Sequence, residues 1–221
     1  LETAQMRRQV KNPPTGAGVT VVIQLGKWRR VLTVNVTPCM NNALNTGQTR
    51  LPRKQAEGSI YDNIPRFAVA TGNVDVMECV LRKMGIDDTE FKAGDIGMGV
   101  PATGRVQLYK NSSGVNGSSG AVYSSAGETP SDDKLWGNQT TLNAYDAVLF
   151  PCTGKADNKS AAAQTALVDY TNKGGRVFTT HYSYVWLYNN TQLGSVTPMA
   201  TKSWQSTATW HADNANYGTT T

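Results

Sequence analysis

Tyr145-Asp-Ala-Val-Leu-Phe-Pro151 and Arg176-Val-Phe-Thr-Thr180 frame the segment that decides the fold. Both are short apolar runs typical of buried strands. Between them, Ser160 is a suitable helix N-cap, and Lys173-Gly-Gly175 provides a stop signal. The apolar face of this predicted helix comprises Ala163, Ala166, Leu167 and Tyr170. The order strand, helix, strand predicts two parallel strands joined by a crossover helix.

The same alternation extends upstream. Residues 67–72 form a buried-strand run, Asn73 is positioned to cap a helix that ends at Gly85, and residues 104–109 predict another strand. The predicted inner face of that helix is Met77, Val80, Leu81 and Met84. We therefore expect residues 64–221 to form an α/β domain, a flavodoxin-like three-layer sandwich with a mainly parallel sheet. We expect this domain to be incomplete at its C-terminal end.

Residues 1–63 form a different, β-rich segment. Residues 18–36 contain two runs rich in Val and Thr on either side of Gly26, which predict a hairpin or two consecutive strands. The stretch 38–64 is irregular in sequence. Because an isolated hairpin is marginal in water, these strands either complete a β-sandwich or pack on the rest of the chain.

The charge of the chain is concentrated in this first segment. The net charge is +5, and residues 1–66 hold ten Lys and Arg against three acidic residues. Clusters at Arg7-Arg8, Lys27-Trp-Arg-Arg30 and Arg50-Leu-Pro-Arg-Lys54 are candidates for phosphate contact, but no nucleic-acid recognition motif accompanies them. Outward Lys and Arg on strands explain them better, so we predict no nucleic-acid partner. No apolar run is long enough to predict a membrane span.

Cysteine and histidine are too sparse to predict a metal site. The three cysteines form no C-x-x-C pair and there are two histidines, so we expect neither a metal nor another cofactor. Low charge and several N-x-[ST] triplets favour a secreted or cell-surface protein. In an oxidising compartment we expect a Cys79–Cys152 disulfide, and the alternative is a Cys152 thiolate stabilised by nearby N–H dipoles. The triplets begin at Asn35, Asn111, Asn116, Asn138, Asn158 and Asn189.

Ligands of parallel sheets collect beyond the carboxyl ends of the strands. Polar or glycine residues follow three predicted strands there: Gly72, Asn73 and Asp75; Cys152, Thr153, Gly154 and Asp157; and His181, Tyr182 and Ser183. His181 is a candidate general base, with Asp75 or Asp157 as the carboxylate that orients it. The alternative is a partly buried histidine that hydrogen-bonds to a loop. Gly72, Asn73, Thr153, Gly154, Tyr182 and Ser183 are the predicted binding residues.

Residues 145–154 and 166–183 together resemble the class I glutamine amidotransferase-like superfamily. That resemblance implies a strand, a helix, a Gly-Gly turn and a strand that enters a nucleophile elbow. The elbow positions here are Thr179 to Ser183, without the cysteine nucleophile and without both glycines of the sharp turn. We therefore expect neither the strained elbow backbone nor its thiol chemistry. His181 at the elbow is more similar to the trehalose-utilisation (ThuA-like) branch.

The segment from Gln24 to Arg30 also resembles secreted bacterial proteins in which a carboxypeptidase-regulatory-like β-sandwich precedes such a domain. Two functional hypotheses follow. The first is a secreted bacterial binding or structural protein, surface-located or filament-forming, on a catalytically degenerate scaffold, with itself or a surface glycan as partner. The second is a hydrolase of a glycan or peptide-like substrate with His181 as general base. Tryptophans such as Trp136 and Trp186 could stack on sugars, although core packing is their more common role.

Overall fold

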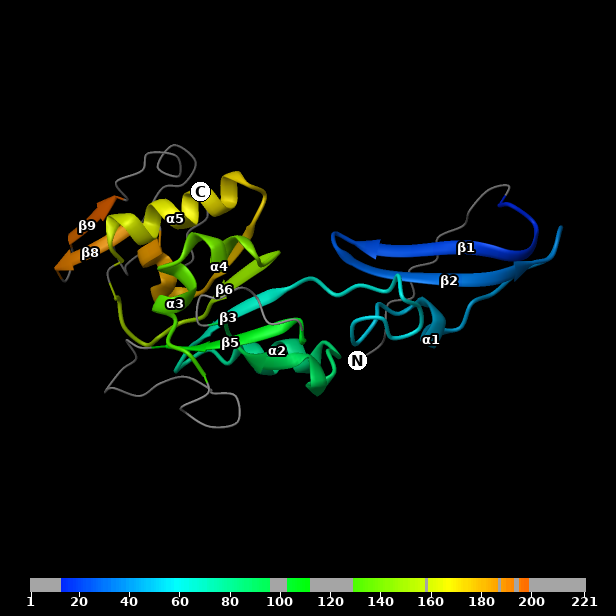
Figure 1. Ribbon diagram of the computed structural model, residues 1–221, viewed down its shortest axis with the longest axis horizontal. Coiled ribbons are helices and arrows are strands. Elements are labelled where there is room, and N and C mark those ends of the chain that lie inside the picture. The colour runs from blue at the N-terminus through cyan, green and yellow to red at the C-terminus, as the bar shows by residue number, and fades with distance from the viewer. Residues whose placement is uncertain are drawn as a thin grey trace, which may run out of the picture. The chain divides into compact units, whose positions relative to one another are not determined.

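The computed structural model describes residues 13–95, 103–111, 129–157 and 159–186, together with the backbone of 188–192 and 195–198. The chain divides into two compact units between Ile64 and Pro65 (Figure 1). Each unit is considered by itself below. The second unit contains the residues predicted to form a site.

A five-stranded parallel sheet organises the second unit. Its strands are β3 (Phe67–Thr71), β4 (Phe91–Ala93), β5 (Val106–Lys110), β6 (Ala147–Phe150) and β7 (Arg176–Thr179), in the order β4-β5-β3-β6-β7. Every neighbouring pair is parallel, which confirms the α/β fold with a parallel sheet. The short edge strand β4 was not predicted, because three residues carry too little periodicity to be recognised.

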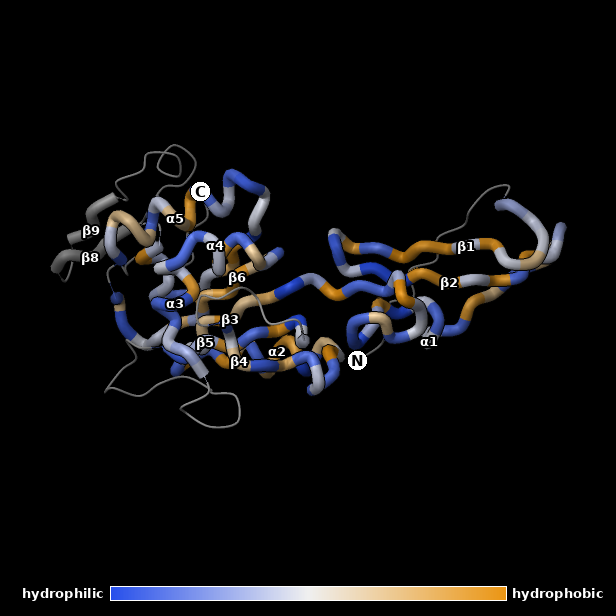
Figure 2. The backbone as a smooth tube through the Cα atoms, in the orientation of Figure 1, coloured by the Kyte–Doolittle hydropathy of each residue, from blue (hydrophilic) through white to orange (hydrophobic). Residues whose placement is uncertain are grey.

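Helices cover both faces of this sheet. Figure 1 shows α2 (Met77–Lys83) on one side and α3 (Asp133–Trp136), α4 (Gln139–Asn143) and α5 (Ala161–Asn172) on the other. Successive residues of a strand point to opposite faces. Ala68 and Val148 accordingly belong to the core beneath α3, α4 and α5, while the next residue of each strand, also buried, points the other way. Burial on both faces explains why the central strands β3 and β6 are almost entirely apolar (Figure 2).

Helix α5 follows the sequence prediction closely. The Ser160 side chain accepts a hydrogen bond from the Ala163 N–H at 3.2 Å, so it is the N-cap. Ala163, Leu167 and Tyr170 are buried against the sheet, as predicted, and Ala166 is partly buried. After the helix, the Gly175 N–H donates to the Tyr170 carbonyl, and a side chain at Gly175 would collide with the Tyr170 ring.

Helix α2 differs from its prediction at its start and on its outer face. It begins at Met77 with Val76 as N-cap and no side-chain cap, so the prediction that Asn73 caps it is wrong. Residues 72–76 form an irregular connection that bends at Asn73 and Val74, and the Val74 N–H donates to the Cys152 carbonyl at 3.3 Å. Leu81 is buried as predicted, but Val80 and Met84 are exposed. The connection that leads into the helix is thus hydrogen-bonded to the loop after β6.

The first unit is built on an antiparallel hairpin. Strands β1 (Gly16–Leu25) and β2 (Trp28–Val36) pair from Val19↔Val34 to Leu25↔Trp28 around a turn in which Gly26 has a φ of +60°. The hairpin is not isolated, because the Trp28 indole N–H donates to the Pro52 carbonyl at 2.8 Å and Trp28 is buried. The irregular stretch 37–64, with the short helix α1 (Thr46–Thr49), therefore packs on β2.

A charged network fastens that stretch to the hairpin. The two terminal guanidinium nitrogens of Arg50, Nη1 and Nη2, each donate to the Glu57 carboxylate at 2.8 Å, and the buried Arg30 side chain contacts the same carboxylate. The buried Asp62 carboxylate accepts the Val31 N–H at 2.8 Å. Two arginines from the basic clusters thus serve an internal ion network, which explains part of the basic charge without any phosphate ligand.

Several predicted features lie outside the described residues. These include the N-x-[ST] triplets that begin at Asn116 and Asn158. Strands β8 (Tyr188–Gln192) and β9 (Ser195–Pro198) form an antiparallel pair in the tail whose sequence showed no clear pattern. Among the helices in the described ranges, none has the length and apolarity needed to cross a membrane.

Candidate functional site

The carboxyl ends of β3, β6 and β7 converge on one place. The register pairs Val69 with Leu149 and Phe150 with Thr179. Extending it past the strand ends sets Gly72 beside Cys152 and Cys152 beside His181. The chain proceeds from β3 to one edge of the sheet through β4 and β5, and to the other through β6 and β7. The crevice between β3 and β6 is therefore the topological switch point, where ligands of open α/β sheets bind.

Gly72 permits the closest approach at this point. A Cβ atom added there would meet the Cys152 carbonyl oxygen, with the Asp75 carbonyl oxygen 3.0 Å away. Backbone atoms cannot move aside as a flexible side chain can, so only glycine fits. The predicted binding residue Gly72 thus allows the β3 and β6 loops to pack against each other.

Thr180 connects all three loops. Its hydroxyl donates to the Asp75 carboxylate at 2.5 Å and accepts the Cys152 N–H at 2.8 Å. Ser183, one turn later, donates to the Pro151 carbonyl at 2.9 Å. These hydrogen bonds hold the loops after β3, β6 and β7 in one arrangement. Thr180 was not among the predicted site residues, because its β-branched side chain is ordinary at a strand end.

A thiol and an imidazole meet at the centre of this arrangement. Cys152 Sγ lies 3.3 Å from His181 Nδ1 and 3.4 Å from the Gly154 nitrogen, whose N–H points to the sulfur. Cys152 is 1% exposed, whereas His181 is exposed. The imidazole can take the thiol proton through Nδ1, and the Gly154 N–H favours the negative sulfur. The arrangement contains the groups that an activated cysteine requires: a thiol, a base within hydrogen-bonding distance and an N–H donor to the sulfur.

His181 adopts a strained backbone conformation. Its φ is +37°, in the left-handed region that non-glycine residues seldom occupy. The expectation that the elbow lacks backbone strain is therefore wrong at this residue. It begins the 3-10 helix η3 (His181–Trp186), and its ring lies 4.2 Å from that of Tyr182 at an interplanar angle of 37°. Such strain is retained where surrounding structure imposes it, often at functional sites.

The predicted Cys79–Cys152 disulfide is wrong. All three cysteines are described and each is a free thiol. Cys79 is exposed on α2, while Cys152 is buried beside His181. Membership of the same α/β unit was the reason for pairing them, but strand and helix directions place the two sulfurs in different surroundings.

Neither predicted carboxylate orients the His181 ring. Asp75 accepts the Thr180 hydroxyl, and Asp157 accepts Lys159 Nζ at 2.7 Å. Within the described residues, the imidazole's one hydrogen-bonding contact is with Cys152 Sγ. The geometry thus assigns Asp75 to fixing the loops and His181 to the thiol.

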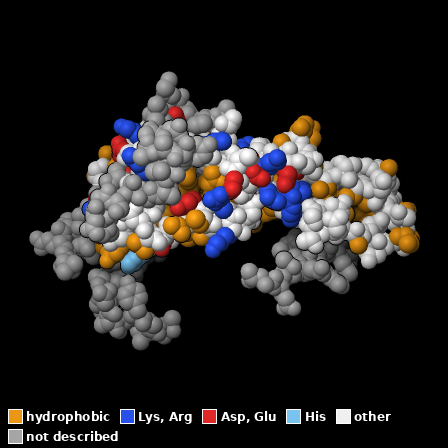
Figure 3. All heavy atoms as spheres, turned by 90° about the horizontal axis from the view of Figure 1, so that it is seen from below, with side chains coloured by type: hydrophobic (Ala, Val, Ile, Leu, Met, Phe, Trp, Pro, Cys, Tyr) orange, Lys and Arg blue, Asp and Glu red, His pale blue; other side chains and the backbone are white. Residues whose placement is uncertain are grey.

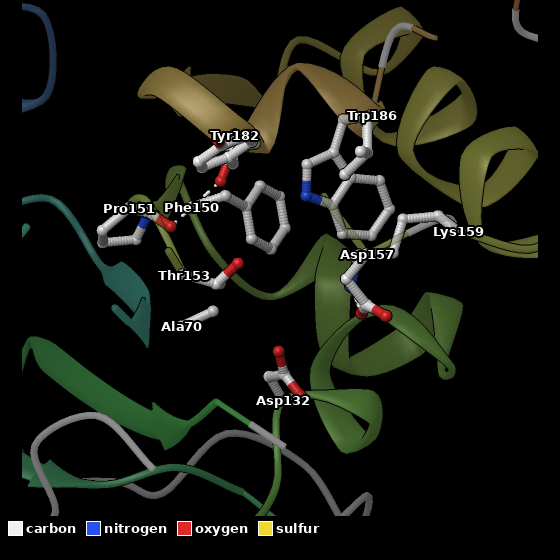
Figure 4. A pocket seen from close by; sticks show the side chains of 11 residues that line it. Ala70, Asp132, Phe150, Pro151, Thr153, Asp157, Lys159, Tyr182 and Trp186 are labelled. Carbon is white, nitrogen blue, oxygen red and sulfur yellow. Dashed lines mark hydrogen bonds and ion pairs between the residues drawn. The ribbon is translucent and has the colours of Figure 1, made fainter. Parts of the chain in front are cut away.

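A small pocket lies next to Thr153 and Tyr182, in the loops that follow β6 and β7. Figure 4 shows the rings of Phe150, Tyr182 and Trp186 on one side of it and Asp132 on the other. Its volume is about 20 Å³, room for about one water molecule. Asp157 and Thr153 also line it. The pocket does not enclose a sugar or peptide, so a substrate of that size would have to lie across the open surface.

Two tryptophans beside this pocket are core residues. Trp136 and Trp186 make an edge-to-face contact at 5.9 Å, and the ammonium of Lys159 lies 5.2 and 5.5 Å from their ring centres. Trp186 also stacks on Phe150 at 4.5 Å. Trp186 is buried, so it packs in the core rather than presenting a face to a sugar.

The other predicted binding residues lie on the same three loops. Asn73 follows Gly72, and the Thr153 hydroxyl donates to the Lys155 carbonyl at 2.9 Å within the β6 loop. Gly154 has a φ of +85°, which lets its N–H turn back to Cys152 Sγ. Cys152 and His181 each stand two residues beyond the end of their strand, β6 or β7. This equal spacing was a sequence signal for their proximity, but it does not specify the direction of either side chain.

In the ranges that the structure describes, no cluster of three or more His, Cys, Asp or Glu side chains is placed to hold a metal ion. Comparison of the chain with protein families, curated proteins and solved structures finds no match. The site must therefore be interpreted from its own geometry.

Proposed function

We propose that the protein is a thiol-dependent hydrolase of ester or amide bonds, with Cys152 as nucleophile and His181 as general base. The 3.3 Å contact between Cys152 Sγ and His181 Nδ1, at the switch point of the sheet, carries the proposal. The proposal keeps His181 as the general base of the hydrolase hypothesis. It differs in the partner of His181, which is the Cys152 thiol rather than a carboxylate. The same proposal includes a secreted location and an amidotransferase-like ancestry. In that family the cysteine would follow the strand that corresponds to β7, whereas Cys152 follows the neighbouring strand β6.

The reaction would use the thiol and imidazole in two steps. The thiol proton passes to His181 Nδ1 as Sγ attacks the carbonyl carbon, and the leaving alcohol or amine takes that proton as its bond to carbon breaks. Water, deprotonated by His181, then attacks the thioester. The acid leaves, and the Cys152 sulfur recovers its proton. The low exposure of Cys152 requires the substrate to reach the sulfur from the His181 side, where the imidazole is open to solvent.

The test uses a background in which exposed Cys39 and Cys79 are changed to Ser, so that Cys152 is the remaining thiol. We expect 4-nitrophenyl ester hydrolysis and alkylation of Cys152 by iodoacetamide. Cys152→Ser should abolish both, and His181→Gln should reduce ester turnover by about a hundredfold or more. Lys155→Gln, an exposed change in the same loop, is the matched control. Unchanged turnover in Cys152→Ser would refute the mechanism.

The second candidate is the binding or structural protein, supported by the edge of β1. Among the described residues, β1 pairs with β2 alone and contains no charged side chain. Val22 and Leu25 are exposed, and Figure 2 shows an apolar β1. Such an edge can pair with another strand. Concentration-dependent association in sedimentation experiments, abolished by Val22→Lys but not by Thr37→Lys, would support self-association. A monomer at all concentrations would exclude it.

A further inference from the structure

The α/β unit has one concentrated apolar surface, and it begins beside the thiol. Among the described residues of this unit, five large hydrophobic side chains are exposed, and four lie between positions 74 and 84. Val74, Val76, Val80 and Met84 are 59%, 50%, 42% and 60% exposed. We call these four residues the apolar strip. Scattered exposed apolar residues need no explanation, but a contiguous group marks a contact surface.

Helical spacing makes the strip continuous. Val76 is the N-cap of α2, and Val80 and Met84 follow at intervals of four, so the three lie along one side of the helix. At a rise of 1.5 Å per residue, the distance from Val76 to Met84 is about 12 Å along the axis. The strip therefore has the dimensions of an extended alkyl chain rather than of a globular partner.

Three hydrogen bonds connect the loop that carries Val74 to the reacting residue, Cys152. The Val74 N–H donates to the Cys152 carbonyl at 3.3 Å. The neighbouring Asp75 accepts the Thr180 hydroxyl, which itself accepts the Cys152 N–H. In Figure 3 the pale-blue histidine side chain and a group of orange hydrophobic side chains lie on the same face. The strip thus begins at a residue that is hydrogen-bonded to the backbone of Cys152.

From this proximity of exposed apolar side chains to Cys152 we propose that the site takes esters or amides of apolar acyl groups, with the carbonyl at Cys152 and the alkyl chain along the strip. This inference rests on the proposed hydrolase function and narrows its substrate class. Burial of each methylene against the valines removes apolar surface from water, so binding should strengthen with chain length. The small, partly charged pocket beyond Tyr182 has no room for such a chain.

The experiment compares acetyl, butyryl, hexanoyl and octanoyl esters of 4-nitrophenol, using the background without Cys39 and Cys79. We expect kcat/KM to rise about tenfold from acetyl to octanoyl. Val76→Ser together with Val80→Ser should remove that rise. Val22→Ser, at a similarly exposed valine of the first unit, should keep it. A flat series in the native sequence, or an unchanged rise in the double variant, would overturn the assignment.

A second measurement separates this inference from the function on which it rests. Labelling of Cys152 by N-methylmaleimide and N-hexylmaleimide needs no turnover, and the hexyl reagent should react faster in a strip-dependent way. That result without ester hydrolysis would refute the hydrolase and support the apolar-ligand surface. Ester hydrolysis that does not depend on chain length would refute the role of the strip in binding the alkyl chain, but not the hydrolase function. A dimer in sedimentation experiments that Val76→Ser and Val80→Ser dissociate would assign the strip to a second copy of the chain and overturn the proposal.

Discussion

The Thr180 hydroxyl donates a hydrogen bond to the carboxylate of Asp75, 105 residues earlier in the chain. The same oxygen accepts the Cys152 N–H, so one side chain sets the spacing of three strand ends. The half-buried position of this contact makes its loss costly, because both partners would need new hydrogen bonds. The contact between Cys152 and His181 depends on this spacing.

Removal of that hydroxyl should weaken both the fold and the site. We expect Thr180→Val to lower the free energy of unfolding by about 1 to 3 kcal/mol, since it leaves a carboxylate and an N–H without their partner. Urea unfolding measures the loss, and the rate of Cys152 alkylation reports the loosened loops. Thr33→Val, at an exposed threonine on β2, is the control and should change stability by less than about 0.5 kcal/mol. Equal effects of the two changes would contradict the role of Thr180.

Local patterns were sufficient to predict four of the five strands of the sheet, but not the contacts at the carboxyl ends of these strands. The runs that became β3, β6 and β7 are short and apolar, and Ser160 and Gly174-Gly175 mark the ends of α5 through local chemistry. Because β3, β6 and β7 are parallel neighbours, the loops that follow them lie at the same end of the sheet. The partner of Cys152 depends instead on side-chain directions at the strand ends, which apolar periodicity does not specify.

The outer face of α2 shows the same limit. Apolar spacing predicted Val80 and Met84 to be buried, but both are exposed, and the connection that leads into the helix is tied to Cys152 and Thr180. Those ties are long-range, so no local window of sequence contains them. The strained backbone of His181 is also imposed by its surroundings, and its sequence lacks the glycines that usually announce such a turn.

Gly72→Ala should disrupt the switch point directly. The added methyl group would collide with the Cys152 carbonyl and force the β3 and β6 loops apart. We expect a loss of about 1 to 3 kcal/mol in the free energy of unfolding. Faster alkylation of Cys152 should accompany the loss, because the buried sulfur becomes accessible. A stable variant with unchanged alkylation would show that the loops can separate without affecting the thiol.

Acid should release the stretch 37–64 from the hairpin through Glu57. Hydrogen bonding by Arg50, the Arg53 N–H and the charges of Arg50 and Arg30 together lower the pKa of this carboxyl from 4.5 to about 2, although burial opposes them. A pKa that is lower in the folded state adds stability above pH 4.5, and this stability is lost as the pH falls towards 2. The protection of the Trp28 indole N–H against hydrogen exchange, relative to a free indole at the same pH, should therefore fall between pH 4.5 and pH 2.

The matched variant for this window is Glu57→Gln. It removes the charge but keeps the size, and we expect a loss of about 1 to 3 kcal/mol at neutral pH. Near pH 2 the difference in exchange rate between the native and variant proteins should be smaller than at neutral pH, because the native carboxyl is then about half protonated. A difference at pH 2 as large as the one at neutral pH would indicate that packing, rather than charge, accounts for the role of Glu57.

Lys159 should stabilise the core beside the pocket through its charge. Its ammonium lies 2.7 Å from an Asp157 carboxylate oxygen and faces the rings of Trp136 and Trp186, with the lysine side chain only 7% exposed. Cation–π contacts strengthen when they are withdrawn from water. Lys159→Met keeps the length but loses these contacts, so we expect about 1 to 3 kcal/mol lower stability in urea unfolding. Lys173→Met, at an exposed lysine after α5, should be neutral. Equal stability of both variants would mean that the aliphatic stem of Lys159, and not its charge, fills this space.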